Sequence, residues 1–122
     1  RGRFQRRQGR MGGKEKHMKI YISGKITGTK DYPERFQRAA EAITAKGHEA
    51  INPLMLNTIL NPWTTTWEQY MLADLGLLRA SDAAYFMPGW EESNGARVEY
   101  GEAVRMQKRI FYQIEDIEEA KA

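Results

Sequence analysis

The segment AAYFMPGWEESNGARVEYGEA, residues 83–103, decides the fold that we expect for this chain. Its first five residues form a short apolar run typical of a buried strand, and the residues after Asn94 have the spacing of a helix that ends near Lys108. Ser93 or Asn94 is a natural N-cap for that helix, because either side chain can accept a hydrogen bond from a free amide. The segment therefore predicts a strand, a loop and a helix in succession.

Glu99 is the unusual residue of this predicted helix. It lies three residues after Ala96 and four before Ala103, so it shares a helix face with small residues. A glutamate on a packed face is rare, and the nearby helix N-terminus would favour its charged form. Gly101 weakens the helix and predicts a close approach to its backbone. The pattern fits either a functional carboxylate or a solvated glutamate on an amphipathic helix.

Length and composition narrow the class of protein. A chain of 122 residues supports one domain with a core large enough for a small α/β fold. It has no cysteine, which excludes disulfides and thiolate metal sites. No apolar run reaches the length of a membrane span and no signal-peptide core is present, so we expect a cytoplasmic protein that is not bound to a membrane.

Residues 1–17 carry the excess positive charge. They hold seven of the 19 Lys and Arg residues and one of the 16 Asp and Glu residues, which leaves the remainder mildly acidic. This segment cannot bury enough apolar surface to fold alone. We expect a disordered basic tail, an appended or upstream extension, with a nucleic-acid-binding arm as the alternative. The folded domain is then residues 18–122, and nucleic acid is not its expected partner.

The rest of the chain alternates strand-like and helix-like segments. Runs rich in apolar and β-branched residues predict strands at 19–23, 48–51, 83–87 and 109–113. Helical spacing predicts helices at 33–46, 65–80 and 94–108. Strands separated by helices imply right-handed crossovers and a parallel sheet. We therefore predict a small doubly wound α/β fold of the flavodoxin or Rossmann type, with four or five parallel strands and helices on both faces.

Several local features refine this prediction. The spacing of Asp31 and Glu34, and of Thr65 and Glu68, predicts capping boxes at the starts of two helices. His48 has no second histidine near it apart from the tail, so we expect a surface position and no metal site. The apolar residues within 52–63 indicate a segment that covers something, either as a lid over a pocket or as a subunit contact.

Asp74 is the one charged member of an apolar helical stripe. The other members of this stripe are Trp67, Tyr70, Met71, Leu75 and Leu78. An aspartate in such surroundings costs stability unless it is paired or used, and desolvation should raise its pKa. The simpler alternative is a polar residue at the edge of the stripe, hydrogen-bonded to a loop amide.

The predicted topology brings two loops together. If the strand order is second, first, third, fourth, the ligand crevice lies between the first and third strands at their carboxyl ends. The loops 24–30 and 88–94 meet there, beside the helix that carries Glu99. Loop 24–30 has two glycines and two lysines, yet it matches neither a dinucleotide fingerprint nor a P-loop. Trp90 could stack on a base in this crevice or anchor its loop on the core.

Four motifs together resemble the nucleoside 2-deoxyribosyltransferase superfamily. They are YISGKITG at 21–28, WEQ at 67–69 with DL at 74–75, SNGARVEYGEA at 93–103, and KRI at 108–110. The pattern is closest to small phage and bacterial members of unknown function and to 2-deoxynucleoside 5-phosphate N-glycosidases. It spans essentially all of residues 18–113, and its most specific part is EYGEA with a serine six residues upstream of the first glutamate.

The resemblance implies roles for individual residues. Glu99 falls on the nucleophile that attacks the sugar, Asp74 on the aspartate that assists departure of the base, and Tyr21 on a tyrosine that borders both. The implied substrate-binding residues are Gly24, Ile26, Gly28, Trp90, Ser93, Asn94 and Gly95, with Ser93 on a serine that contacts the 5-phosphate in the nucleotide hydrolases. Lys25 and Thr27 differ from the loop residues of those hydrolases.

The implied function is cleavage or transfer of the N-glycosidic bond of a 2-deoxynucleoside or its 5-phosphate through a covalent glutamyl-sugar intermediate. No metal and no cofactor is expected, and the partners would be a small nucleoside or nucleotide and further copies of the chain in a homodimer or larger assembly. The alternative is a catalytically silent nucleotide-binding or sensor protein on the same fold.

Overall fold

The structure is a computed structural model that describes residues 15–121. Most of the predicted basic tail, residues 1–14, therefore lies outside the described residues. Its last part is in contact with the domain, because the Glu15 amide donates to the carbonyl of Glu119 and the Lys121 amide donates to the carbonyl of Glu15.

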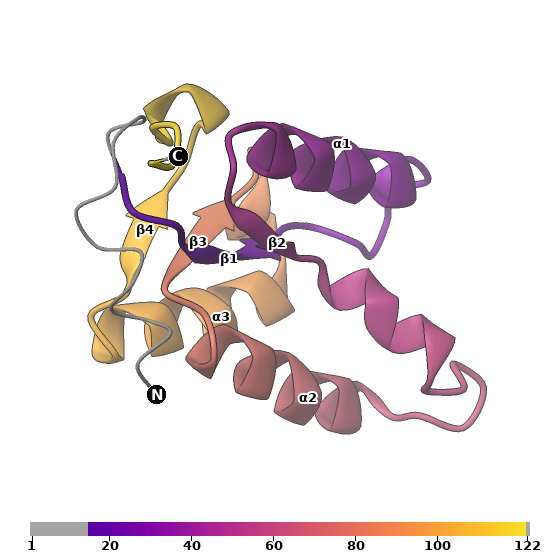
Figure 1. Cartoon of the computed structure of the whole chain (residues 1–122). Helices are drawn as coiled ribbons and strands as arrows, with labels where there is room; N and C mark the ends of the chain where they lie inside the picture. Colours follow the sequence, from indigo (N-terminus) through magenta and orange to yellow (C-terminus); the bar gives the residue numbers. More distant parts are fainter. Residues whose placement is uncertain (1–14, 122) are drawn as a thin grey trace.

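Four parallel strands form one sheet, with β1 at Lys19–Ser23, β2 at Glu49–Ile51, β3 at Ala83–Phe86 and β4 at Arg109–Phe111. Their order is β2-β1-β3-β4 (Figure 1), which is the order assumed above to locate the ligand crevice. Tyr21 of the central strand β1 lies opposite Ile51 on one side and Ala84 on the other. This order places the topological switch point between β1 and β3.

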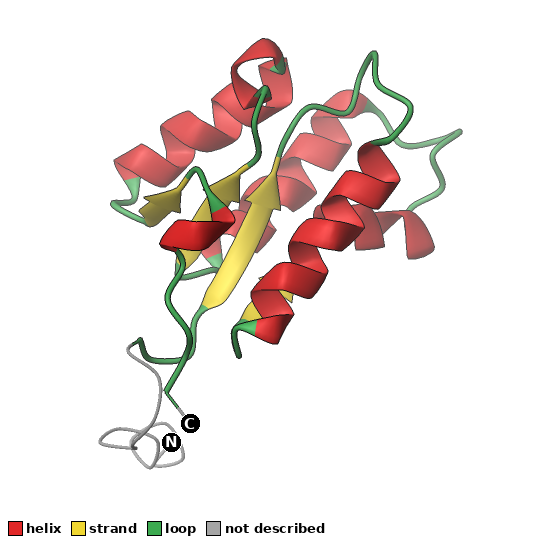
Figure 2. Cartoon of the chain, turned by 90° about the horizontal axis from the view of Figure 1, so that it is seen from above, coloured by secondary structure: helices red, strands yellow, loops and turns green. Residues whose placement is uncertain are grey.

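Helices cover both faces of the sheet. Helix α1, Tyr32–Ala45, lies on one face, and helices α2, Trp67–Arg79, and α3, Asn94–Arg105, lie on the other (Figure 1). Seen from above, α1 runs alongside the strands (Figure 2). Short 3-10 turns occupy Pro53–Thr58 (η2), Trp90–Glu92 (η3) and Ile114–Asp116 (η4). The predicted doubly wound α/β fold is confirmed, with four strands.

The sheet separates two apolar layers because successive residues of a strand face opposite sides. Ile20 and Ile22 of β1 pack in the layer under α1, together with Phe36 and Ile43 of that helix. Tyr21 faces the other layer, whose further buried members are Leu78, Ala84, Phe86 and Ala103. One strand therefore serves both layers.

Two of the predicted helix caps differ in the structure. The Asp31 side chain makes no cap bond and instead accepts from Arg35 Nε at 3.2 Å. The capping box of α2 is formed by Thr66 and Gln69 rather than Thr65 and Glu68. Thr65 is one residue too early, because its hydroxyl donates to the carbonyl of Asn61 in the preceding turn.

The prediction that His48 lies on the surface is wrong, because its side chain is buried. Its Nδ1 accepts from the Met18 amide at 3.1 Å, and its Nε2 lies 2.7 Å from the carbonyl of Glu118, to which it must donate. The C-terminal segment returns over this end of the sheet, and the Ala120 amide donates to the carbonyl of Lys46. His48 therefore ties the start of β1 to the last residues of the domain.

The expected close approach to Gly101 is also absent. Apart from its chain neighbours and the backbone of α3 itself, no atom in the described part of the chain lies within 4 Å of the place a Cβ would occupy there. Gly47 follows the C-cap residue of α1 and has a φ of +88°, and a Cβ there would come within 3.1 Å of Ala120. Across residues 15–121, no helix is both long and apolar enough to cross a membrane.

Candidate active site

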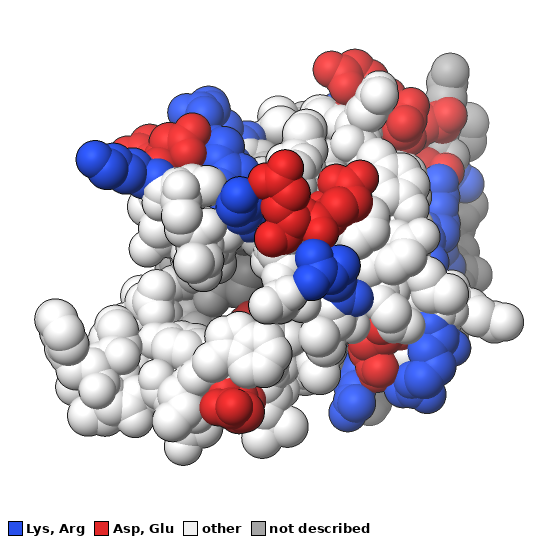
Figure 3. Space-filling model, turned by 180° about the vertical axis from the view of Figure 1, so that it is seen from behind, with Lys and Arg blue, Asp and Glu red and all other residues white. Residues whose placement is uncertain are grey.

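A cavity of about 760 Å³ opens at the carboxyl ends of the strands. Its walls come from the loop after β1, from η2 and the loop that follows it, from α2, and from the start of α3. From behind, the molecule is visibly hollowed beside a largely uncharged lower projection (Figure 3). The site lies where parallel α/β folds bind their ligands.

Several predicted site residues line this cavity. They are Gly24, Ile26, Asp74, Ser93, Asn94, Gly95 and Glu99. The start of α3 at the cavity wall is set by Ser93. Its hydroxyl accepts a hydrogen bond from the Ala96 amide at 3.1 Å and so caps the helix. Glu99 follows one turn later on the buried face of α3, beside Ala96 and Ala103.

Glu99 is held by two hydroxyl groups of β1. Its side chain is only 5% exposed. The Tyr21 hydroxyl donates to Oε2 at 2.7 Å, and the Ser23 hydroxyl donates to Oε1 at 2.6 Å. Tyr21 and Ser23 are two residues apart in the strand and therefore face the same side of the sheet. Both carboxylate oxygens thus have a fixed donor.

The electrostatics of Glu99 are a balance of opposed effects. Burial raises its pKa, while hydrogen bonds from Ser23, Tyr21 and Asp74 lower it in partial compensation. The sequence predicts that the N-terminus of the helix favours the charged form of Glu99. In the structure, the hydroxyls of Tyr21 and Ser23 favour the charged form instead. The helix dipole acts most strongly within the first turn of α3, and Glu99 lies beyond that turn.

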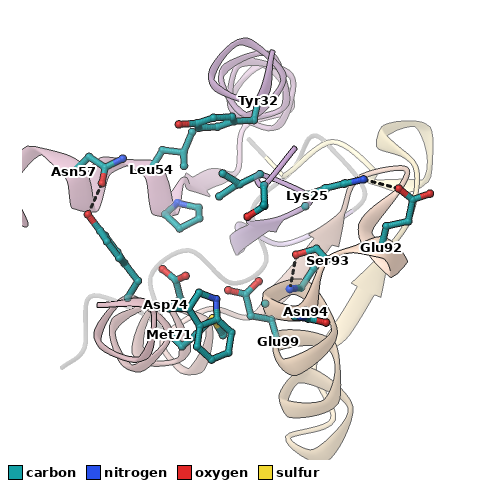
Figure 4. Close-up of a pocket in the computed structure, with 18 of the residues that line it drawn as sticks. Lys25, Tyr32, Leu54, Asn57, Met71, Asp74, Glu92, Ser93, Asn94 and Glu99 are labelled. Carbon is teal, nitrogen blue, oxygen red and sulfur yellow. Dashed lines mark hydrogen bonds and ion pairs between the residues drawn. The ribbon is translucent and has the colours of Figure 1, made fainter. Parts of the chain in front are cut away.

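Asp74 faces Glu99 from α2 (Figure 4). Burial raises the pKa of Asp74 to about 8, with further contributions from the Glu99 charge and from a hydrogen bond to Glu99. The same surroundings raise the pKa of the Tyr21 hydroxyl, which therefore stays a donor. Of the two carboxyl groups, Asp74 is therefore the one that favours the proton, because the Glu99 charge raises the pKa of Asp74.

Polar groups lie at both ends of the cavity, on either side of this carboxyl pair (Figure 4). At one end the Tyr70 hydroxyl donates to Asn57 Oδ1 at 2.9 Å. At the other end Lys25 Nζ lies 2.7 Å from Glu92 Oε1. Trp67 adds aromatic surface to the wall formed by α2.

Three predicted site residues do not line the cavity. Tyr21 lies behind Glu99 and acts on it rather than on the open space. Gly28 is in the loop after β1, but only the preceding loop residues reach the cavity wall. The base-stacking role expected for Trp90 is not supported, because its ring packs on Phe86 and Tyr100, at centroid distances of 5.2 and 4.6 Å, and anchors its loop on the core.

Sequence reasoning missed Ser23 as a site residue. The signal was available, because a polar residue two positions after Tyr21 in a strand must point to the same side. The polar pairs at the ends of the cavity, Asn57 with Tyr70 and Lys25 with Glu92, had no comparable signal, since each joins segments that only the folded chain brings together.

The segment 52–63 covers a pocket, which is one of the two roles that the sequence leaves open. Pro53, Leu54 and Asn57 line the cavity. Met55, Ile59 and Trp63 are exposed large apolar residues, and Trp63 is 94% exposed. The segment is therefore a wall of the pocket, and a subunit contact through its outer side stays a prediction. Within residues 15–121, no group of three or more His, Asp or Glu side chains could hold a metal ion.

The fold defines a small Rossmann-like protein, with a cavity lined by Asp74 and Glu99 at the switch point of its sheet. The chain belongs to the family known as domain of unknown function DUF4406, whose model matches residues 18–112. It is also similar in structure to the 2-deoxyribosyltransferase of the psychrotolerant bacterium Bacillus psychrosaccharolyticus.

That structural similarity has a TM-score of 0.59 at 16% sequence identity, over 75% of this chain and 69% of the other. No curated protein sequence matches the chain. The similarity confirms that the fold is that of a 2-deoxyribosyltransferase, as the sequence motifs predict.

Proposed function

We propose that this protein cleaves or transfers the N-glycosidic bond of a 2-deoxynucleoside or its 5-phosphate through a covalent intermediate on Glu99. The observation that carries the proposal is the carboxyl pair at the floor of the cavity, where the pKa of Asp74 is raised to about 8 and Glu99 accepts hydrogen bonds from two hydroxyls. Two carboxyl groups with opposed protonation states suit glycosidic cleavage. The fold shared with a 2-deoxyribosyltransferase supports this class of substrate.

In the first step, an oxygen of Glu99 attacks C1 of the sugar while the bond from C1 to the base nitrogen breaks. The electron pair of that bond leaves with the base, and the Asp74 proton neutralises it. The products are the free base and a 2-deoxyribosyl ester of Glu99. Tyr21 and Ser23 hold the attacking carboxylate in place through their hydroxyls.

In the second step, water attacks C1 and the ester bond to Glu99 breaks. The Asp74 carboxylate takes the proton of that water, which restores both groups to their starting states. Free 2-deoxyribose or its 5-phosphate is released. A second base that attacks C1 in place of water gives a new nucleoside, so the same intermediate serves hydrolysis and transfer.

The test is base release from a panel of deoxynucleosides and deoxynucleoside monophosphates, with and without an added acceptor base. Glu99→Gln removes the nucleophile and keeps the side-chain volume, so base release should fall at least about a thousandfold. Glu41→Gln makes the same change on the exposed side of α1 and serves as the control. Intact-mass spectrometry of quenched reactions should show a deoxyribosyl adduct on the wild type that Glu99→Gln lacks.

The absence of base release and of transfer across the whole panel would reject the proposal. Tight binding of a nucleoside or nucleotide by calorimetry, without turnover, would then support the silent binding protein.

A further inference from the structure

The following inference rests on the proposed function and concerns the group on the 5-carbon of the sugar. Asp74 gives its proton to the base, so the base lies on the α2 side of the cavity, where aromatic side chains line the wall. Glu99 reaches C1 from the α3 side. Lys25 and Glu92 lie at the opposite end of the cavity (Figure 4). In this orientation of the substrate, the 5-carbon points toward them.

An ion pair closes this end of the cavity. Lys25 comes from the loop after β1 and Glu92 from the end of η3, and their side chains are 30% and 68% exposed. Lys25 is the one Lys or Arg residue, among those that the structure describes, that lines the cavity. Its charge lowers the pKa of Glu92, so Glu92 is ionised at neutral pH.

The backbone that carries Lys25 is fixed against α1. Arg35 Nη2 donates to the Lys25 carbonyl at 2.7 Å and to the Thr29 hydroxyl at 3.3 Å. The same guanidinium is paired with Asp31 through its Nε. Lys25 is therefore presented to Glu92 from an anchored loop.

The charges around the 5-carbon are unfavourable for a phosphate. A phosphate monoester carries a charge of about −1.5 to −2 at pH 7. Two positive features lie near this position: the ammonium group of Lys25, and the N-terminus of α3, which is worth about half a positive charge. The carboxylates of Glu92 and Glu99 outweigh them. We propose that Glu92 is a specificity-determining residue that selects deoxynucleosides with a free 5-hydroxyl over their 5-phosphates. Specificity of this kind comes from repulsion of the competing ligand.

The Lys25–Glu92 pair suits a neutral hydroxyl for a second reason. A hydroxyl can donate to the carboxylate and accept from the ammonium group at the same time. Neither charged group then loses its partner. A phosphate would compete with Glu92 for Lys25 and leave that carboxylate beside a like charge.

The experiment compares kcat/KM for a deoxynucleoside with kcat/KM for its 5-monophosphate, with the same base in both. In the wild type the ratio should favour the deoxynucleoside by at least about tenfold. Glu92→Gln should shift the ratio toward the monophosphate by about tenfold or more, because Lys25 is no longer paired with a carboxylate and its charge can act on the phosphate. Glu91→Gln removes an equal charge from the neighbouring position, which does not line the cavity, and should leave the ratio within about twofold. High salt should narrow the wild-type ratio, since Glu92 is exposed.

A wild-type preference for the monophosphate, or a Glu92→Gln ratio equal to that of Glu91→Gln, would overturn the inference and leave the proposed function standing. If no substrate is turned over, the proposed function fails instead. Calorimetry then decides the inference, which requires the monophosphate to bind more weakly than the deoxynucleoside and the gap to close in Glu92→Gln.

Discussion

The proton that Asp74 and Glu99 share gives the proposed reaction a defined pH dependence. Glu99 must be ionised, so the rate should fall as the pH drops through its raised pKa. Asp74 must be protonated, so the rate should fall again as the pH rises through about 8. A bell-shaped profile of kcat/KM against pH is expected.

Asp74→Asn tests the alkaline limb of this profile. The amide has no proton to give at any pH, so base release should fall about 10²- to 10⁴-fold, and the decline near pH 8 should disappear from the residual rate. The measurement is kcat/KM between pH 4 and 10 for both proteins. An alkaline limb that survives in the variant would assign it to another group.

The hydroxyls of Tyr21 and Ser23 should control the acid limb. Tyr21→Phe or Ser23→Ala removes a donor to the Glu99 carboxylate, worth about 1.5 to 3 kcal/mol for a charged acceptor. The pKa of Glu99 then rises, and the acid limb moves up by about one to two pH units. Tyr85→Phe removes a hydroxyl from the opposite face of the sheet and should leave the limb in place.

Individual residues differ in how far the sequence reveals them. Glu99 and Asp74 are visible because a charged residue in an apolar stripe is costly unless it is used or paired. The pairing of Lys25 with Glu92 is not visible, since it depends on how two loops fold over the ends of different strands. Of the two roles that the sequence leaves open for Trp90, the structure supports the loop anchor, because Tyr100, ten residues later on α3, stacks on its ring.

At the scale of one element, the start of α2 offers a test of stability away from the cavity. Thr66→Ala removes the hydroxyl that caps the Gln69 amide and should lower the free energy of unfolding by about 1 kcal/mol. Denaturant unfolding measures this change. Thr64→Ala is the matched control, because the Thr64 hydroxyl makes only a long 3.4 Å bond to Asn61 and its loss should cost little. Equal losses in both variants would argue against the cap.

The elements themselves were largely predictable, and their exact ends were not. The run 19–23 forms a strand in full because its side chains are apolar or β-favouring and Gly24 follows directly. Three consecutive threonines precede α2, and each has the chemistry of an N-cap. Which one caps the helix depends on the turn at Asn61, where Thr65 is already engaged.

For the whole molecule, the C-terminal segment should be a large contributor to stability. Ile117 is fully buried in the layer under α1. Ile117→Ala should lower the free energy of unfolding by about 2 to 5 kcal/mol through lost burial and the cavity that remains. Chemical denaturation of the variant gives the value. Glu119→Ala, an exposed change two residues later, should stay within about 0.5 kcal/mol of the wild type.

The same segment explains why the sequence misplaced His48. A lone histidine at the first position of a predicted strand has a surface position as its default, and nothing near it in the chain indicates otherwise. The partner that buries it, the carbonyl of Glu118, is 70 residues away. Alternation of strands and helices was enough to predict a parallel sheet, whereas the contact that closes this end of the molecule has no local signal in the sequence.

The division of β1 between two layers bears on how such a protein can evolve. Ile20 and Ile22 pack against α1, while Tyr21 and Ser23 support the carboxyl pair. Substitutions in the α1 layer are exposed to selection for stability alone, so that layer can drift and repack over long periods. Under the proposed function, the opposite side of the same strand is under selection for chemistry as well, and divergent descendants should keep its two hydroxyls long after the α1 layer has changed.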